Sequence, residues 1–269
     1  MPLEMVNQLP YNHPYRWDGT LFGKPKLWRP NVLGASLGLW LDAEDDQSII
    51  LNGATVSQWN DRSGNGRNAT QATAANQPTY TTAGLNNKPI LTFNGTTNVM
   101  SVDLSFVADA SYSVLAVTAR TSNRANNFFI GGNSQLTNRQ LIAGWISDLS
   151  FVYAQFGNDV SVTVPGYTVT TPLIFALGLN TSVGRNVYLD GTLGNSNTNT
   201  TALISNTGGV LGAWSNNTFY QGYIAELAIT TGVLSVDNRQ KLEGYLAWKW
   251  GLQGNLPEGH PYKSFPPTI

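Results

Sequence analysis

Short runs of alternating hydrophobic and polar residues recur along this chain, and turn-forming residues separate them. The run 111–119 (SYSVLAVTA) is typical, because alternate residues of an extended strand point to opposite faces of a sheet. The pairs Asn52-Gly53 and Asp190-Gly191 are residues that tight β-hairpin turns favour. The pattern predicts an all-β protein of many short antiparallel strands, which pack as two sheets.

Two segments depart from this alternation. Residues 173–179 (LIFALGL) are dense enough in hydrophobic residues for a strand that is buried on both faces. Near the C-terminus, hydrophobic residues at 242, 245 and 246 follow helical spacing. Ser235 can cap the start of this segment, and Gly251 can end it. We therefore predict one main helix from Ser235 to Trp250.

The stretch from Trp59 to Tyr80 (WNDRSGNGRNATQATAANQPTY) is rich in turn-forming residues, and the rest of the chain is typical of a shell that holds such loops. Exposed aromatic rings on loops can stack on sugars, while Asn and Asp side chains bind sugar hydroxyls. The candidate ligand-binding residues are Trp59, Asp61, Asn65, Trp214 and Asn216. Each of them could equally belong to the core or to a turn.

Residues 1–32 form a separate zone in which recurrent prolines disfavour helices and inner strands. Aromatic residues stand between these prolines, namely Tyr11, Tyr15, Trp17, Phe22 and Trp28. A disordered tail is usually poor in aromatic residues. We therefore predict an extended N-terminal arm (1–32) before a single domain (33–269). The arm either lies on its own domain or docks on a neighbouring subunit or larger assembly.

Several motifs resemble the laminin-G-like members of the concanavalin A-like lectin/glucanase superfamily. They are Trp-Leu-Asp-Ala at 40–43, Trp-Asn-Asp-Arg-Ser-Gly-Asn-Gly at 59–66, Gln-Pro-Thr-Tyr at 77–80 and Pro-Ile-Leu-Thr-Phe-Asn-Gly at 89–95. The close of the chain, with Tyr-Leu-Ala-Trp-Lys-Trp-Gly at 245–251 and His-Pro-Tyr at 260–262, resembles phage and marine-bacterial laminin-G-like domains. The resemblance covers about residues 37–267 and implies a jelly-roll β-sandwich of two curved antiparallel sheets.

Domains of this type occur in phage virion proteins and in bacterial surface proteins, so the resemblance implies two alternative functions. The first is a non-enzymatic structural protein of the virion surface, a phage capsid decoration (cement) or fibre subunit. Its partners would be the major capsid protein or another virion protein and further copies of itself, with a trimer expected by analogy. The second is a carbohydrate-binding module or adhesin of the cell surface or extracellular space, which would bind a cell-surface glycan.

The composition of the chain limits the classes of partner that it is expected to bind. Charged residues make up 12% of the 269 residues and the net charge is −1, so neither nucleic acid nor an anionic membrane is expected to bind. The chain has no cysteine, which excludes disulfides. No apolar run approaches the roughly 18 residues of a membrane span. The first residues lack the pattern of a secretory signal peptide. We therefore expect a protein that stays in the cell that makes it, one that leaves by a route other than general secretion, or a mature chain whose leader has been removed.

No catalytic residue can be assigned from the sequence. Ser36 lies in a Gly-x-Ser-x-Gly pattern, but a strand-like run follows it where a nucleophile elbow needs a helix. The glutamates are far apart, so the paired carboxylates of a glucanase are missing, and we interpret Glu226 as structural. The acidic residues 42–46 lack EF-hand spacing and are expected in a solvated loop. No cofactor is expected, although calcium, common in relatives, is left open without mapped ligands.

Overall fold

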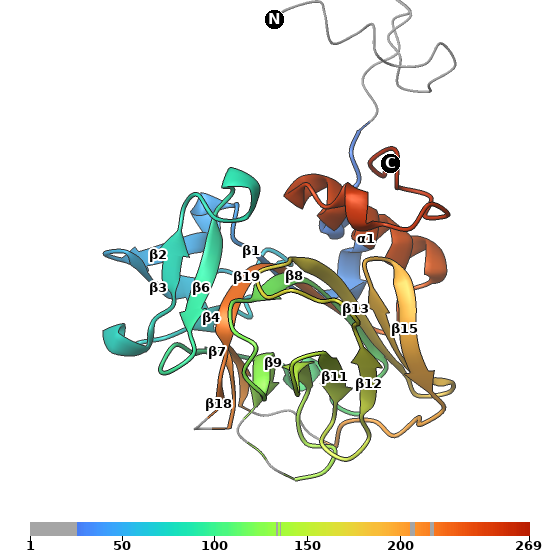
Figure 1. Ribbon diagram of the computed structural model, residues 1–269, viewed down its shortest axis with the longest axis horizontal. Coiled ribbons are helices and arrows are strands. Elements are labelled where there is room, and N and C mark those ends of the chain that lie inside the picture. The colour runs from blue at the N-terminus through green and yellow to red at the C-terminus, as the bar shows by residue number, and fades with distance from the viewer. Residues whose placement is uncertain (1–25, 133, 135, 205–207, 216–217) are drawn as a thin grey trace, which may run out of the picture.

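The computed structural model describes residues 26–269 apart from 133, 135, 205–207 and 216–217. Strands dominate this part of the chain, and its one α-helix lies near the C-terminus (Figure 1). The strands are β1 (Leu37–Asp42), β2 (Ile49–Asn52), β3 (Thr55–Trp59), β4 (Ala69–Thr70), β5 (Thr79–Thr81), β6 (Ile90–Asn94), β7 (Met100–Val102), β8 (Tyr112–Arg120), β9 (Asn127–Gly132), β10 (Ile142–Trp145), β11 (Ser150–Ala154), β12 (Val160–Thr163), β13 (Leu173–Asn180), β14 (Gly184–Leu189), β15 (Thr192–Asn197), β16 (Gly209–Leu211), β17 (Ala213–Trp214), β18 (Thr218–Phe219) and β19 (Gln221–Thr231).

The helices are α1 (Val236–Trp250) and the short 3-10 turns η2 (Pro30–Ser36), η3 (Asp46–Ser48), η4 (Ala74–Asn76), η5 (Leu85–Asn87), η6 (Ser105–Val107) and η7 (Gln253–Asn255). Ser235 caps α1, because its side chain accepts a hydrogen bond from the backbone N–H of Asn238. Gly251 ends the helix in the left-handed region, at φ 70°. The predicted helix from Ser235 to Trp250 is therefore confirmed.

One continuous antiparallel sheet contains all strands except the β17–β18 pair. Along one part of it the strands pair in the order β15-β14-β13-β8-β19. The long strand β19 then pairs with both β1 and β6. From β6 the sheet continues through β5, β3, β4, β7, β16, β9, β10 and β11 to β12.

The sheet bends so far that its two ends approach each other (Figure 1). Side chains of β15 bridge the gap: the amide of Asn195 donates to the carbonyl of Ser161 at 2.7 Å, and the amide of Asn197 donates to the carbonyl of Asp159 at 3.2 Å. The all-β prediction is confirmed. The expected division into two separate sheets is not observed, because β3, β4 and β5 connect the two halves by hydrogen bonds.

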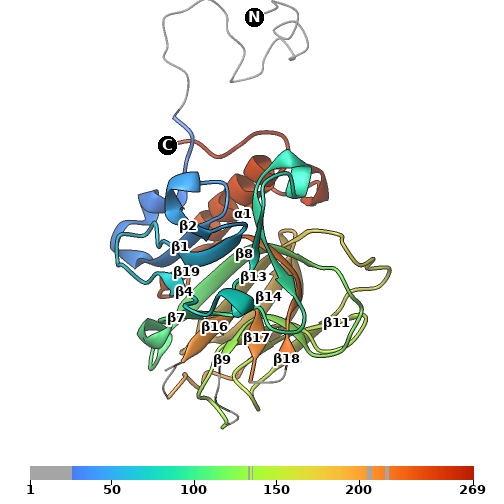
Figure 2. The same ribbon diagram turned by 90° about the vertical axis from the view of Figure 1, so that its left-hand side faces the viewer.

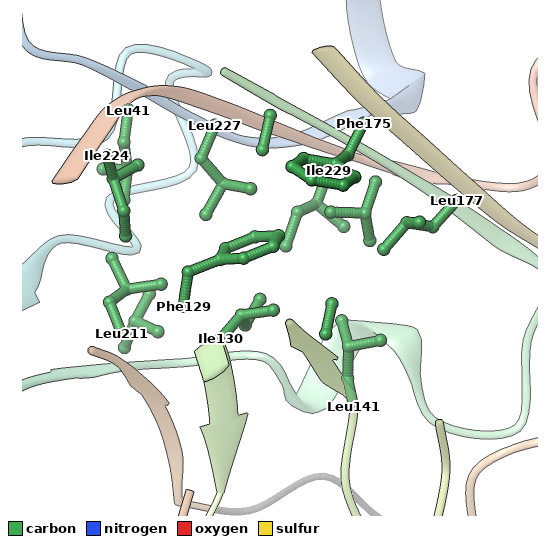
Figure 3. Close-up of a cluster of buried hydrophobic side chains, with 14 of the residues drawn as sticks. Leu41, Phe129, Ile130, Leu141, Phe175, Leu177, Leu211, Ile224, Leu227 and Ile229 are labelled. Carbon is green, nitrogen blue, oxygen red and sulfur yellow. The ribbon is translucent and has the colours of Figure 1, made fainter. Parts of the chain in front are cut away.

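The main hydrophobic core fills the space that the bent sheet encloses (Figure 3). Phe129 of β9 lies near its middle, with its ring stacked on Phe151 at 6.4 Å between centroids and tilted against Phe175 at 5.8 Å. Leucines and isoleucines from β1 and β19 face these rings, among them Leu41, Ile224 and Leu227. This burial of aliphatic and aromatic surface is the main stabilising contribution to the fold.

A second hydrophobic cluster lies on the other face of β8, β13 and β19, under α1. The alternation predicted for 111–119 is confirmed, since Tyr112, Val114 and Ala116 join the enclosed core while Leu115 and Val117 join the outer cluster. Both faces of β13 are covered, as its run of hydrophobic residues predicts. The helix therefore seals a face that would otherwise be exposed.

Only the last residues of the predicted arm are described. Leu27 forms an isolated antiparallel bridge with Thr268, and the backbone N–H of Trp28 donates to Pro267 at 2.9 Å. Figure 2 shows the chain entering the domain beside its C-terminus. Tyr11, Tyr15, Trp17 and Phe22 lie outside the described residues. No helix in the described part of the chain is long and apolar enough to cross a membrane.

Candidate functional site

A cavity of about 600 Å³ lies where the start of the described chain, β1, α1 and the C-terminal tail meet. Its lining combines aromatic rings with charged side chains of both signs. The lining residues are Leu27, Trp28, Arg29, Trp40, Asp42, Glu44, Asp45, Arg62, Tyr245, Trp248, Lys249, Pro266 and Pro267.

Aromatic residues form the apolar part of this lining. Trp28 is buried, and its ring meets Tyr245 edge-on at 6.3 Å between centroids. Trp248 is half-buried, and its indole N–H donates to the carbonyl of Tyr262 at 2.9 Å, which fixes the ring on the tail. Because Trp28 packs on its own domain, it holds the arm's last residues in place rather than projecting as a free anchor.

Glu226 of β19 is fully buried behind the cavity, where it accepts hydrogen bonds from three side chains. The indole N–H groups of Trp40 and Trp250 donate to its two carboxylate oxygens, each at 2.7 Å. The Tyr245 hydroxyl donates to Oε1 at 3.0 Å. Buried charges need such partners, so the structural interpretation of Glu226 is supported by its surroundings.

Lys249 of α1 reaches both Glu226 and Asp42. Its Nζ lies 2.7 Å from Oε2 of Glu226 and 2.5 Å from Oδ2 of Asp42. Asp42 and Glu226 are directly opposite each other on the paired strands β1 and β19, and cross-strand partners share one face of a sheet. One amine therefore stands between two carboxylates, on the face that α1 covers.

Burial, followed by the negative charge of Glu226, raises the pKa of Asp42 to about 7, although Lys249 opposes this shift. Burial alone would lower the pKa of Lys249, but the attraction of Glu226 and Asp42 outweighs it and raises that pKa. The two carboxyl groups thus compete for one cation. A pKa of about 7 makes both the protonated and the ionised form of Asp42 accessible near neutral pH.

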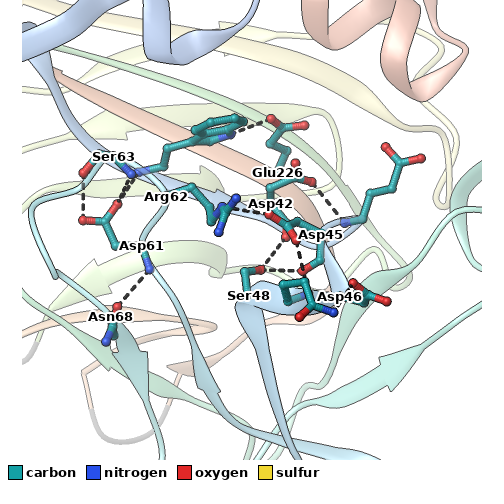
Figure 4. Close-up of polar contacts among 12 residues, drawn as sticks. Asp42, Asp45, Asp46, Ser48, Asp61, Arg62, Ser63, Asn68 and Glu226 are labelled. Carbon is teal, nitrogen blue, oxygen red and sulfur yellow. Dashed lines mark hydrogen bonds and ion pairs between the residues drawn. The ribbon is translucent and has the colours of Figure 1, made fainter.

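Polar groups continue along the rim of the cavity. The Nε of Arg62 lies 2.7 Å from Oδ2 of Asp45 (Figure 4). Glu44 accepts a hydrogen bond from Lys88, and its Oε2 lies 3.9 Å from Nζ of Lys249. The side chain of Arg62 is 45% exposed, so a ligand in the cavity could reach its guanidinium group.

The residues predicted to bind ligand from the turn-rich stretch have structural roles. Trp59 is fully buried in the enclosed core and cannot stack on a sugar. Asp61 lies beside Ser63 (Figure 4) and accepts hydrogen bonds from the backbone N–H groups of Trp40, Ser63 and Arg67, at 2.9, 2.8 and 3.1 Å. Asn65 donates to the carbonyls of Leu37 and Gly38, at 2.9 and 3.2 Å.

The other two candidates lie apart from this loop in the sequence. Trp214 of β17 is half-buried and packs edge-on against Phe128 at 5.5 Å between centroids. Its indole nitrogen has no hydrogen-bond partner among the described residues. Asn216 lies outside the described residues. Of the candidates, only Trp59, Asp61 and Asn65 belong to one segment, and none of the four described candidates lines the cavity.

The acidic segment 42–46 is only in part the solvated loop that the sequence predicted, since Asp46 is exposed but Asp42 is buried. Asp42 is buried at the end of β1 against Lys249, and Asp45 caps the short turn η3 by accepting from the backbone N–H of Gln47. The spacing of the charges along the chain did not indicate that Lys249, more than two hundred residues away in the sequence, forms an ion pair with Asp42. Within the described residues, no group of three or more His, Cys, Asp or Glu side chains is arranged to hold a metal ion.

Two sequence signals could have indicated the cavity. The Trp-Lys-Trp run at 248–250 places a cation between aromatic residues on a predicted helix, and Asp42 follows a predicted core strand. Their meeting could not be foreseen, because it depends on how α1 crosses β1 and β19.

No family model and no curated protein sequence matches this chain.

Several solved structures are similar in fold. Domain 4 of AbnA, a GH43 extracellular arabinanase from Geobacillus stearothermophilus in complex with arabinotriose, matches 78% of this chain and 98% of its own, with a TM-score of 0.57 and 17% identity. The ligand binding domain of botulinum neurotoxin serotype D, in complex with N-acetylneuraminic acid, matches 80% of this chain with a TM-score of 0.57 and 13% identity. Trypanosoma rangeli sialidase in complex with sialic acid matches 80% of this chain with a TM-score of 0.57 and 14% identity.

The chain spans 52% of the neurotoxin chain and 33% of the sialidase chain. The similarity therefore concerns part of each of those proteins, whereas nearly the whole arabinanase domain is matched. These structures include both enzymes and binding domains. At this level of identity the comparison establishes a β-rich, lectin-like fold and no activity.

Proposed function

We propose that this protein is a non-enzymatic, lectin-like domain that binds a carbohydrate in the cavity between β1, α1 and the C-terminal tail. The observation that carries the proposal is the combination of aromatic walls and planar charged groups in one cavity of about 600 Å³. Sites for small ligands are concave and mostly apolar, with a few polar groups that fix orientation. A sugar ring offers both an apolar face and a set of hydroxyl groups.

Each part of the lining has a role in this proposal. Trp248 and Tyr245 offer aromatic surface for the apolar face of a sugar ring. Arg62 and Asp45 present a guanidinium and a carboxylate, which form directional hydrogen bonds with hydroxyl groups. The complexes of the similar structures with arabinotriose and N-acetylneuraminic acid support a carbohydrate as the ligand class.

The non-enzymatic part of the proposal rests on the carboxyl groups. A glycoside hydrolase usually needs two of them beside the scissile bond. Glu226 is sealed behind the indoles of Trp40 and Trp250, and its oxygens are occupied by their N–H groups. Asp42 is in contact with Lys249. Glu226 is therefore out of reach of a substrate, and Asp42, although it lines the cavity, is engaged by Lys249.

We also propose, more specifically, that this domain is a laminin-G-like jelly roll. Its support is that the core lies between β8, β13 and β19 on one side and β9, β10 and β11 on the other. The motifs at 40–43, 59–66 and 245–251 add to it. In this protein the two halves form one continuous sheet and not two separate sheets, because short strands join them.

The proposal is tested by screening a glycan array and measuring each hit by calorimetry, with and without calcium. We expect Trp248→Ala and Arg62→Ala to weaken binding by about tenfold each, because a ring contact or a hydrogen bond to a charged group contributes roughly 1–2 kcal/mol. The matched control is Trp214→Ala. Trp214 is also a half-buried tryptophan and was a ligand-binding candidate from the sequence, but it does not line the cavity.

Unchanged affinity in Trp214→Ala, with loss in the two cavity variants, supports the cavity as the site. Loss in Trp214→Ala alone would move the site to β17. If no glycan binds at millimolar concentration, the carbohydrate proposal is wrong.

A structural role on a phage virion is the second proposal. The observation that favours it is the exposure of Leu27 and Ile269, apolar side chains that lie where the predicted arm joins the domain. A partner that docked where the arm joins the domain would cover these two apolar side chains. Removing residues 1–25 and measuring attachment to the assembled virion tests this role.

A further inference from the structure

Lys249, Asp42 and Glu226 form a cluster of one amine and two carboxyl groups. Nζ of Lys249 lies 2.5 Å from Oδ2 of Asp42 and 2.7 Å from Oε2 of Glu226. The side chains of Lys249 and Asp42 are 12% and 11% exposed, and that of Glu226 is 0% exposed. An amine and two carboxyl groups are thus held together with little exposure to solvent.

We propose that Lys249 and Asp42 condense into an intramolecular isopeptide bond, with Glu226 as the proton carrier. This cross-link would join α1 to β1, near the two ends of the domain. It is independent of the proposed carbohydrate binding, because it requires no ligand.

The reaction balances without any co-reactant. The ammonium group of Lys249 gives a proton to Glu226, and the resulting amine attacks Cγ of the neutral carboxyl group of Asp42. Glu226 then carries a proton from the nitrogen to the departing hydroxyl group. The C–N bond forms, the C–O bond breaks and one water molecule leaves. Glu226 is then left with the proton that it first took from Lys249, and it returns to the carboxylate by releasing that proton to solvent. Nothing is oxidised or reduced.

Two features favour this condensation inside the folded protein. Fixed neighbours react as if present at an effective concentration of roughly 10⁵–10⁸ M, which offsets the unfavourable loss of water in solution. Burial also favours the neutral form of the Asp42 carboxyl group. The raised pKa of Asp42, about 7, provides the protonated carboxyl group that the attack needs.

The aromatic surroundings hold the proton carrier in position. Trp40 and Trp250 each donate to one oxygen of Glu226, and Tyr245 donates to Oε1. Nζ of Lys249 lies 3.3 Å from the Tyr245 hydroxyl. These contacts keep Glu226 on the Lys249 side of the cavity wall and limit its rotation.

Such a bond would stabilise a chain that has no cysteine and so cannot form disulfides. A covalent link between residues distant in sequence restricts the unfolded chain and raises stability, as it does for a disulfide that closes a long loop. Here it would connect positions 42 and 249 of 269 residues.

Mass spectrometry of the intact full-length protein, denatured after purification at pH 7, tests the proposal. We expect a mass one water molecule below that of the sequence. Tryptic digestion should then yield a branched peptide in which residues 27–62 are joined to residues 242–263 through Asp42 and Lys249. The branched peptide distinguishes the cross-link from a succinimide at an Asp-Gly pair, which also loses water.

Lys249→Arg keeps the positive charge but cannot condense, so the full mass should return. Glu226→Gln keeps the size of the side chain and should slow or abolish the loss of water. The matched control is Lys241→Arg, also on α1, whose partner Asp237 is exposed; it should still lose water. If the variants do not fold, the wild-type protein alone decides: the unmodified mass and no branched peptide after prolonged incubation would overturn the proposal and leave an ion pair only.

Discussion

The Asp61 carboxylate accepts a hydrogen bond from the backbone N–H of Trp40 at 2.9 Å, although 21 positions separate the two residues. The same carboxylate accepts from the N–H and hydroxyl groups of Ser63, both at 2.8 Å, and from the N–H of Arg67 at 3.1 Å. It therefore fastens the turn-rich loop to β1. Because β1 also provides Trp40 and Asp42, this contact helps to position the wall of the cavity.

Asp61→Ala is expected to lower the free energy of unfolding by about 2–3 kcal/mol, since it leaves partly buried N–H groups of β1 and the loop without an acceptor. Urea unfolding monitored by tryptophan fluorescence measures the change. The control is Glu258→Ala, because the Glu258 side chain is 95% exposed and its removal should stay within about 0.5 kcal/mol. Equal stabilities of the two variants would contradict this role of Asp61.

The sequence predicted the elements of the fold well where local pattern decides them. Period-two alternation identified β8, the continuous hydrophobic run identified β13, and Ser235 and Gly251 marked the limits of α1. Each of these signals depends on neighbours along the chain. The closure of the sheet depends instead on pairings between distant strands, such as those of β4 with β7 and of β7 with β16, and the alternation pattern carries no information about them.

The site was predicted poorly for a related reason. Trp59 and Asp61 have the residue types of a sugar-binding loop, but burial and hydrogen bonding to the backbone occupy them. Asp42 and Lys249 have the residue types of solvated charges, yet they meet under α1. A residue type limits what a side chain can do, whereas the packing of the helix on the sheet decides what it contacts.

The raised pKa of Asp190 predicts that the stability of the protein depends on pH. Burial, followed by the charge of Glu243, raises the pKa of Asp190 to about 6, although its hydrogen bond from the N–H of Ile174 acts in the opposite direction. Since the unfolded value is 3.8, the folded state binds this proton more strongly. The free energy of unfolding should therefore fall as pH rises from about 4 to about 6, and this contribution should be constant above that range.

Asp190→Asn should remove this contribution, which we expect to be about 1–3 kcal/mol, because the group is half-buried and partly screened by solvent. Asparagine keeps an acceptor for Ile174 and tolerates the positive φ of 48° at this turn. Urea midpoints at pH 4, 5, 6 and 7 for both proteins give the difference, in which the other titrating groups cancel. A difference that does not change with pH would show that Asp190 does not titrate in this range.

The N-terminal arm gives the last prediction, and the position of Trp28 decides how to test it. Trp28 is buried against Tyr245, and Leu27 bridges to Thr268. Deleting all of residues 1–32 would therefore damage the domain itself. Deleting residues 1–25 removes Tyr11, Tyr15, Trp17 and Phe22 while keeping these contacts.

If the arm reaches a neighbouring chain, the protein without residues 1–25 should lose its oligomeric state and its attachment to a larger assembly, while its thermal unfolding stays nearly unchanged. The reason is that proline lowers the entropy lost when a segment docks, and aromatic side chains contribute most to interfaces. Light scattering coupled to size-exclusion chromatography measures the mass in solution. Replacing Tyr11, Tyr15, Trp17 and Phe22 by serine in the full-length chain is the matched control for length, and it should have the same effect as the deletion. A truncated protein that keeps its mass and attachment, yet unfolds at a lower temperature, would mean that the arm covers its own domain.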